Sequence, residues 1–240
     1  MKNAPIGSHS GAYEWKAVLL PALGFGLVSI DRFMIMPLFP VMMKDLRLDF
    51  QDLGLITGVL AITWGISSLL TGKLADRYGH RAVIIPAVFF FSVLAGVSGL
   101  ATGLISLMLI RAVIGFAEGA FTPASIVATL EASRPSRRGV NLGLQQAAMP
   151  LFGLALAPIV ATQSLSLMDW HWVFALVMLP GLVVGYLLHR VLRNTQLADL
   201  ALHTSAPTPS RMPARSRLAK WARRETLPRY GAWTSWPRST

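Results

Sequence analysis

The chain has 240 residues, of which 53% are hydrophobic and 14% are charged. Soluble domains carry about 25% charged residues, so this composition argues against a soluble domain and favours a membrane protein. The formal net charge of +11 does not indicate nucleic-acid binding, because more than half of the excess comes from residues 194–240. The absence of cysteine excludes disulfides, a thiolate nucleophile and cysteine metal sites.

Six apolar stretches are long enough to cross a membrane, since about 20 helical residues span the hydrocarbon core. They cover residues 17–42, 53–71, 82–101, 104–130, 140–162 and 170–188. The polar segment 1–16 before them lacks the pattern of a cleaved signal peptide. We therefore expect an all-α polytopic membrane protein, with a six-helix transmembrane bundle over residues 17–193.

Lys and Arg concentrate on one side of the predicted bundle. That side holds Lys2, Lys16, Lys73, Arg77, Arg81, Arg134, Arg137, Arg138, Arg190 and Arg193. The other side holds Lys44 and Arg47, offset by Asp45, Asp49 and Asp52. Because cytoplasmic loops carry the excess of Lys and Arg, we expect both termini in the cytoplasm and the protein in the plasma membrane, the inner membrane of a bacterium.

The segment 194–240 differs from the rest of the chain. It is basic and contains several Pro and Trp residues but no apolar run long enough to span a membrane. A disordered cytoplasmic tail is the favoured interpretation. Contact with anionic lipid is a second one, and an out-of-frame origin of the segment is a third. Nucleic-acid binding is disfavoured, because no folded basic platform is evident.

The stretch Gly72–Arg81 is a polar island between two uncharged runs. It contains two glycines, Gly72 and Gly79, and the charged residues Lys73, Asp76, Arg77 and Arg81. We expect it to form a tight turn between the second and third spans.

Four charged residues lie inside predicted spans: Asp31, Arg32, Arg111 and Glu118. Each costs roughly 2.5–3.5 kcal/mol at the centre of a membrane helix, so each is a functional-site candidate. Arg111 and Glu118 are seven residues apart, which places them within about 20° of the same helix face. Between and beside them, Gly115 and Gly119 permit close approach of a neighbouring helix.

Two interpretations of these charges remain open. Arg111 and Glu118 could pair with each other and hold the bundle, although buried ion pairs stabilise less well than apolar packing. Alternatively, the arginines bind an anion and the carboxylates exchange protons. Gln145 and Gln146 could add hydrogen bonds to the substrate, or bridge helices. Trp64 fits packing better than substrate stacking.

Three motifs resemble the major facilitator superfamily. Gly72-Lys-Leu-Ala-Asp76-Arg77-Tyr-Gly79-His-Arg81 resembles its loop between helices two and three, with His80 where a basic residue is usual. Arg111-Ala-Val-Ile-Gly115-Phe-Ala-Glu118-Gly119 resembles its fourth-helix motif. Trp170-His-Trp-Val-Phe174 resembles its entry to helix six. The resemblance covers about residues 15–193 and implies one six-helix half of that fold.

Within the superfamily, Asp31 and Arg32 together with Arg111 and Glu118 resemble the anion:cation symporter branch. That resemblance implies substrate binding by Arg32 and Arg111, proton coupling by Asp31 and Glu118, and proton-coupled symport of a small organic anion. Gly72, Asp76, Arg77, Gly79 and Arg81 would form the conformational-gating loop.

Other functions remain open at this point. A drug/proton antiporter is disfavoured, because Gly153-Leu-Ala-Leu-Ala157-Pro158 departs from the glycine-rich antiporter motif. A non-transporting fragment, or a subunit that needs a second six-helix half, is a further alternative. No enzyme, cofactor or metal site is expected, since no nucleophile–base pair, metal cluster or phosphate loop is evident. The expected partners are the lipid bilayer, a small organic anion and protons.

Overall fold

The computed structural model describes residues 11–192, which are helical throughout apart from short connections. The elements are α1 (Gly11–Leu46), α2 (Phe50–Tyr78), α3 (His80–Val97), η1 (Ser98–Leu100), α4 (Leu104–Ala132), η2 (Pro135–Arg137), α5 (Arg138–Ala148), η3 (Met149–Leu156), α6 (Ala157–Leu165) and α7 (Trp170–Val191). The predicted tail, residues 194–240, lies outside the described residues.

Six helices in the described part are long and apolar enough to cross a membrane, which confirms the predicted fold class. The fifth of them, Pro135–Leu165, combines α5, η3 and α6. Its middle segment η3 is a π-helix that contains Pro150 and is followed by Pro158. Proline removes α-helical hydrogen bonds, which favours such a local departure from α geometry.

Two polar segments contain more helix than the apolar runs predict. Helix α1 begins at Gly11, so the last residues of the predicted polar segment 1–16 are already helical. Helix α2 continues to Tyr78 and α3 begins at His80, so most of the polar island is helix rather than turn. Only Gly79 separates the two helices, with φ of 87°, a value that glycine adopts readily.

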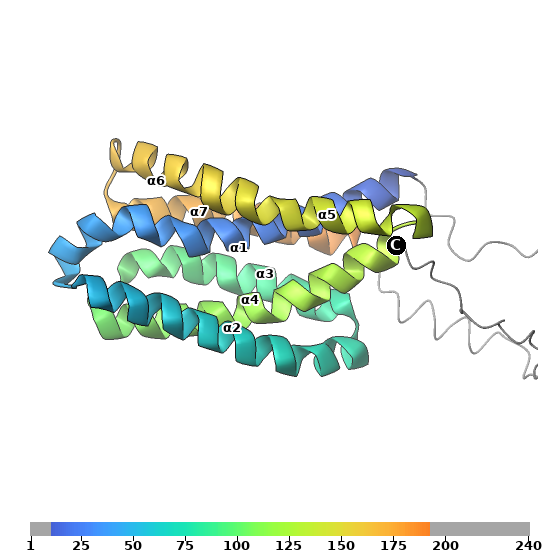
Figure 1. Cartoon of the computed structure of the whole chain (residues 1–240), viewed down its shortest axis with the longest axis horizontal. Coiled ribbons are helices and arrows are strands. Elements are labelled where there is room, and N and C mark those ends of the chain that lie inside the picture. Colours follow the sequence, from blue (N-terminus) through green and yellow to red (C-terminus); the bar gives the residue numbers. More distant parts are fainter. Residues whose placement is uncertain (1–10, 193–240) are drawn as a thin grey trace, which may run out of the picture. The chain divides into compact units, whose positions relative to one another are not determined.

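Helix α1 runs through the middle of the bundle (Figure 1). It contacts α4, α5, η3, α6 and α7, whereas α2 packs mainly on α4, and α3 packs on α4 and α7. Apolar side chains on the remaining surface of α2 are exposed, among them Ile62, Ile66, Leu69 and Leu70. Such a surface suits contact with lipid.

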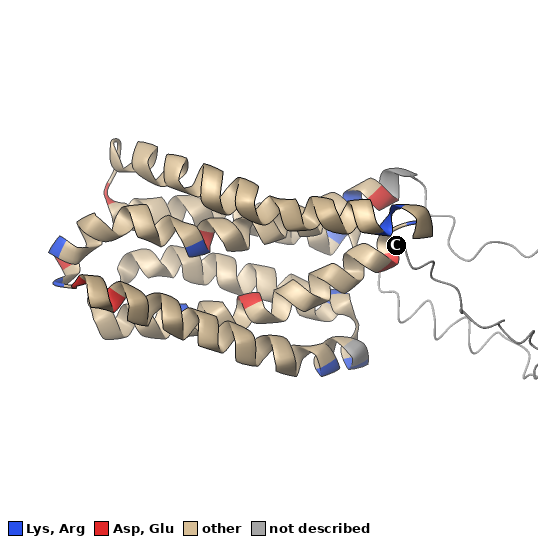
Figure 2. Cartoon of the chain, in the orientation of Figure 1, with Lys and Arg blue, Asp and Glu red and all other residues tan. Residues whose placement is uncertain are grey.

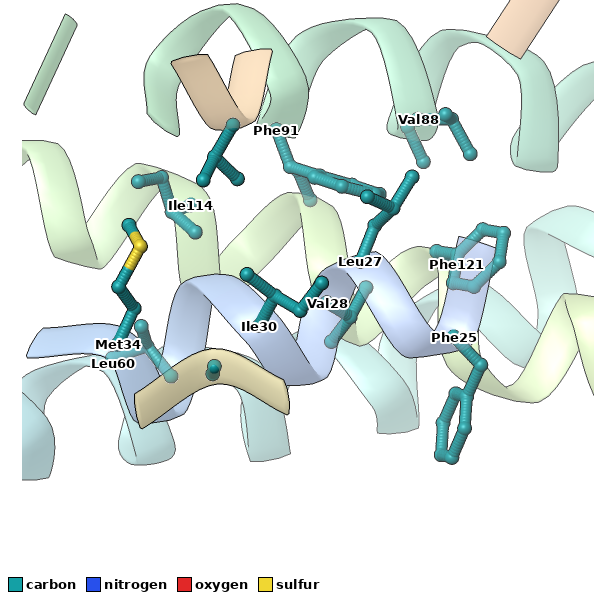
Figure 3. Packing of buried hydrophobic residues seen from close by; sticks show 14 of the residues in the cluster. Phe25, Leu27, Val28, Ile30, Met34, Leu60, Val88, Phe91, Ile114 and Phe121 are labelled. Carbon is teal, nitrogen blue, oxygen red and sulfur yellow. The ribbon is translucent and has the colours of Figure 1, made fainter. Parts of the chain in front are cut away.

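Buried apolar residues of α1, α3 and α4 form a central part of the hydrophobic core. Figure 3 shows Leu27, Ile30 and Met34 of α1 close to residues of those helices. The rings of Phe91 and Phe121 meet edge to face, with centroids 6.0 Å apart. The ring contact joins α3 to α4, and Phe121 also packs closely against Gly24 of α1.

Helices α2 and α4 approach closely through the two predicted glycines. A side chain at Gly115 would collide with Thr63 and with the carbonyl of Leu60. At Gly119 it would collide with the carbonyl of Trp64 and lie 2.8 Å from Ser67. The Ser67 hydroxyl donates a hydrogen bond of 2.6 Å to the Phe116 carbonyl. The glycines therefore act as predicted from their spacing.

Candidate functional site

The four intramembrane charges meet at the contact between α1 and α4. Asp31 and Arg111 are each 1% exposed, and Glu118 is fully buried. The Arg32 side chain is 24% exposed and is the most accessible of the four. The structure thus brings together, from two helices, the four intramembrane charges that the sequence singles out one by one.

The charges form two ion pairs that cross between the helices. Arg111 Nη1 lies 2.8 Å from Asp31 Oδ2, and Arg32 Nη2 lies 2.8 Å from Glu118 Oε2. Arg111 and Glu118 therefore do not pair with each other, although they share a helix face. They stand two turns apart, about 10 Å along the axis at 1.5 Å per residue. Asp31 and Arg32, which are adjacent in α1, therefore pair with residues two turns apart in α4.

Each charged group retains bonding capacity that no described residue uses. The atoms without a hydrogen-bond partner are Asp31 Oδ1, Arg32 Nε, Arg111 Nε, Arg111 Nη2 and Glu118 Oε1. Buried polar atoms are usually paired, and leaving one unpaired costs about 1–3 kcal/mol. Five such atoms lie on these four side chains, so a ligand or ion that reached them could satisfy bonds that the described residues leave open.

Aromatic rings support both arginines. The Arg32 guanidinium carbon lies 5.2 Å from the centre of the Trp64 ring, and that of Arg111 lies 5.4 Å from the Phe174 ring. The Trp64 indole also donates to the Thr122 hydroxyl at 3.4 Å. Trp64 thus packs between α2 and α4 and supports Arg32 through a cation–π contact.

Two cavities adjoin the ion pairs, and Arg32 lines both. The smaller, about 190 Å³, lies between α1, α2 and α4, and is also lined by Phe33, Ile35, Met36, Ile56, Thr57, Leu60, Ala61 and Arg111. The larger, about 330 Å³, is also lined by Phe25, Val28, Ser29, Trp64, Thr122, Ile126, Gln146 and Met149. Arg32 is therefore the charged residue common to both cavities, and Arg111 is a second one in the smaller cavity.

The two predicted glutamines have different positions. Gln145 is fully buried and donates a hydrogen bond of 2.9 Å to the Ser125 hydroxyl, which links α5 to α4. Gln146 lines the larger cavity together with Arg32. Of the two amides, that of Gln146 is the one placed to contact a ligand.

The residues of the predicted gating loop lie at one end of the helices. Figure 2 shows Lys and Arg gathered at that end and sparse along the middle of the bundle. Arg81 donates a hydrogen bond of 3.0 Å to the His189 carbonyl of α7, and Arg77 lies over the Tyr78 ring. His80 Nε2 lies 3.2 Å from Glu131 Oε1 of α4. Gly72 lies in α2, and the Asp76 side chain falls outside what the structure describes.

Sequence reasoning missed a polar cluster around Glu14. This side chain is 3% exposed and pairs with Arg134 Nε at 3.2 Å. The Asn141 amide donates to it at 3.1 Å. An acid in a first helical turn is a common start signal, but Glu14 can be recognised as one only if α1 is known to begin at Gly11.

Comparison with known proteins agrees with this architecture. The family model described as Major Facilitator Superfamily matches residues 22–234. The hexuronate transporter of Bacillus subtilis is 29% identical over 64% of this chain and 36% of its own length. The quinolone resistance protein NorA of Staphylococcus aureus is 31% identical over 54% of this chain and 32% of its own.

A solved structure shares the fold. It is the inward-facing, unoccupied form of a bacterial homologue of the human lysosomal transporter Spinster, with a TM-score of 0.69 at 21% identity. The match covers 78% of this chain and 44% of that one. The chain spans about a third of the length of the two curated relatives. With its six membrane-length helices, this chain is a multi-pass membrane protein that belongs to the major facilitator superfamily, a family of transporters rather than enzymes.

Proposed function

We propose that this chain supplies the anion- and proton-binding part of a secondary transporter that carries a small organic anion together with protons. The observation that carries the proposal is the position of Arg32. Its guanidinium group is paired with a buried carboxylate, Glu118, and it also lines two cavities. An arginine in this position can exchange an internal carboxylate for that of a substrate.

Coupling follows from the competition for Arg32. When a substrate carboxylate pairs with Arg32, Glu118 loses its partner while fully buried. An unpaired charge is costly there, so Glu118 takes up a proton. When the substrate leaves, Arg32 returns to Glu118 and the proton is released. Asp31 and Arg111 provide a second pair of the same kind, in line with the proton-coupling and substrate-binding roles expected for them.

The two arginines differ in availability. Arg111 is held by Asp31 and lies over the Phe174 ring, and it is 1% exposed. Arg32 has its pair with Glu118 and is 24% exposed. Arg32 therefore makes the first contact with the substrate. Arg111, which lines the smaller cavity, completes the binding once its two partnerless nitrogens are reached.

We place the protein in the plasma membrane. In the proposed orientation the basic end of the bundle, which includes Gly72–Arg81, faces the cytoplasm. The positive-inside bias supports it. In the proposed cycle Gly72, Asp76, Arg77, Gly79 and Arg81 form the gating loop, and a second six-helix half faces the two cavities. Major facilitator transporters alternate access by rocking such halves around a site near the midplane.

Drug efflux is the second candidate function. It is favoured by the similarity to NorA, whose name describes quinolone resistance. Against it, a drug cation would lie beside Arg32 and Arg111, which line the smaller cavity. Competition by organic cations rather than by carboxylates would support efflux.

Equilibrium binding of organic carboxylates to the purified chain tests the proposal. We expect Arg32→Gln to abolish binding, and Arg47→Gln, which changes an exposed arginine at the end of α1, to leave it unchanged. In proteoliposomes that hold the assembled transporter, Glu118→Gln should remove proton-driven accumulation while sparing exchange. Accumulation that persists in this variant under an imposed proton gradient would rule out the coupling role.

A further inference from the structure

We infer that the substrate is a carboxylate carried on an apolar body, aliphatic or aromatic, rather than a polyhydroxylated acid. The inference rests on the proposed function, because it takes the anion site at Arg32 as given. The inference adds the chemical class of the part of the substrate that is not the carboxylate. Its evidence is the composition of the cavity walls beside the ion pairs, as far as this chain supplies those walls.

The smaller cavity combines cationic groups with apolar walls. Arg32 and Arg111 both line it, and each also has at least one buried nitrogen without a hydrogen-bond partner behind the wall. The rest of the wall, apart from Thr57, consists of Phe33, Ile35, Met36, Ile56, Leu60 and Ala61. A carboxylate held by the arginines would therefore place the rest of its molecule against carbon.

Thr57 does not offset this, because its hydroxyl is already used. It donates to the Leu53 carbonyl at 2.8 Å, within its own helix. A hydroxyl with its hydrogen committed to the backbone can accept from a ligand but cannot donate to one.

The larger cavity looks more polar in composition but offers little more. The Ser29 hydroxyl donates to the Phe25 carbonyl at 2.8 Å. The Thr122 hydroxyl donates to the Glu118 carbonyl at 2.9 Å and accepts the Trp64 indole N–H. The Gln146 amide is then the main polar group on this wall available to a ligand besides Arg32.

The consequence for selectivity follows from hydrogen bonding. A hydroxylated body would lose its bonds to water and find few replacements on these walls, whereas an apolar body would lose none. A site discriminates strongly when one of two ligands leaves polar groups unpaired. Two ligands with the same carboxylate and ring size but different hydroxylation should therefore bind with clearly different affinity.

Isothermal titration of the full chain in lipid nanodiscs tests the inference with such a pair, cyclohexanecarboxylate and glucuronate. Both carry a single carboxylate on a six-membered ring, and only glucuronate is polyhydroxylated. We expect cyclohexanecarboxylate to bind at least about tenfold tighter. Arg32→Gln should remove this binding. The variant thereby distinguishes binding at the Arg32 site from partition of the ligand into the lipid.

A variant of the cavity wall provides an independent check at an exposed position, where the substitution leaves the buried core unchanged. Met36 is 54% exposed and lines the smaller cavity, so Met36→Gln adds an amide there at similar volume. This variant should reduce the ratio of the affinity for cyclohexanecarboxylate to that for glucuronate. Ile66→Gln, at a similarly exposed position of α2 that lines neither cavity, should leave the preference unchanged.

The outcomes separate the two proposals. Glucuronate binding as tightly as cyclohexanecarboxylate, with both lost in Arg32→Gln, would overturn the apolar-body inference and leave the anion site intact. Binding of both acids that persists unchanged in Arg32→Gln would overturn the proposed function and the inference with it.

Discussion

Helix α4 meets α2 and α1 through surfaces of opposite character. Toward α2 it presents Gly115 and Gly119, whose backbone lies directly against carbonyls and small side chains of α2. Toward α1 it presents Arg111 and Glu118, each paired with a residue of α1. The role of the first surface is to hold α2 and α4 together. The second retains polar atoms without partners, which a purely structural contact has no reason to keep.

The difference separates stability from function along one helix. Close packing of small residues stabilises helix pairs in lipid, where apolar burial contributes little to association. Buried ion pairs stabilise poorly, because desolvation offsets their attraction. This contrast favours the proposed binding role of the α1–α4 charges over a purely structural one. The following variants test this contrast, from the largest expected loss of stability to the smallest.

Asp31→Asn should give the largest loss. It leaves Arg111, 1% exposed, without its charged partner, which costs about 3–5 kcal/mol for a buried pair. Thermal unfolding in detergent measures the effect. The double variant Asp31→Leu/Arg111→Met should recover most of the stability but not anion binding. A double variant that stays as unstable as the single one would show that the pair is structural.

Gly115→Val should have the next largest effect. Its side chain would press on Thr63 and on the Leu60 carbonyl, and overpacking of this kind costs about 1–3 kcal/mol. Gly65→Ala is the matched control, since a side chain there meets nothing within 4 Å. If both variants unfolded at the wild-type temperature, the close α2–α4 contact would not contribute to stability.

Arg32→Gln should reduce stability less and binding more. Glu118 then lacks its partner, but it can take up a proton and become neutral. Carboxylate binding should be lost, with a fall in affinity of at least about 100-fold, because a hydrogen-bonded charge contact is removed. Arg32→Lys should restore part of it, since lysine keeps the charge but not the planar fork. A loss of folding without selective loss of binding would place Arg32 with the structural residues.

Arg134→Ala should have the smallest effect. The Arg134 side chain is 57% exposed, so solvent screens its pair with Glu14 and its contribution is about 1 kcal/mol or less. The buried Glu14 keeps the Asn141 amide as a donor when Arg134 is removed. Unfolding close to the wild-type temperature is the expected result. A loss as large as that of Asp31→Asn would mean that burial does not govern the strength of these pairs.

Much of the architecture can be predicted from sequence, because membrane spans depend on length and hydropathy alone. The apolar runs locate six helices, and the cost of intramembrane charge identifies Asp31, Arg32, Arg111 and Glu118. The spacing of Gly115 and Gly119 predicts close helix contact, which the structure shows. In each case the signal is local and needs no knowledge of the neighbouring helix.

The remaining features depend on how helices are rotated against one another. The crossed pairing of the charges follows from which side of α1 faces α4. The contact of Arg32 with Trp64 has the same origin. The polar island was predicted as a turn, since its charges interrupt an apolar run, yet polar residues continue a helix beyond the membrane without cost. Only Gly79 ends it.

The central claim is that a substrate carboxylate replaces Glu118 at Arg32. Proton uptake on ligand binding tests it most directly, measured by titrating cyclohexanecarboxylate into the chain in weakly buffered solution with a pH indicator. The wild-type chain should take up protons as the anion binds, and Glu118→Gln should bind the anion with that part of the uptake removed. Proton uptake that is identical in the two chains would contradict the exchange of carboxylates at Arg32.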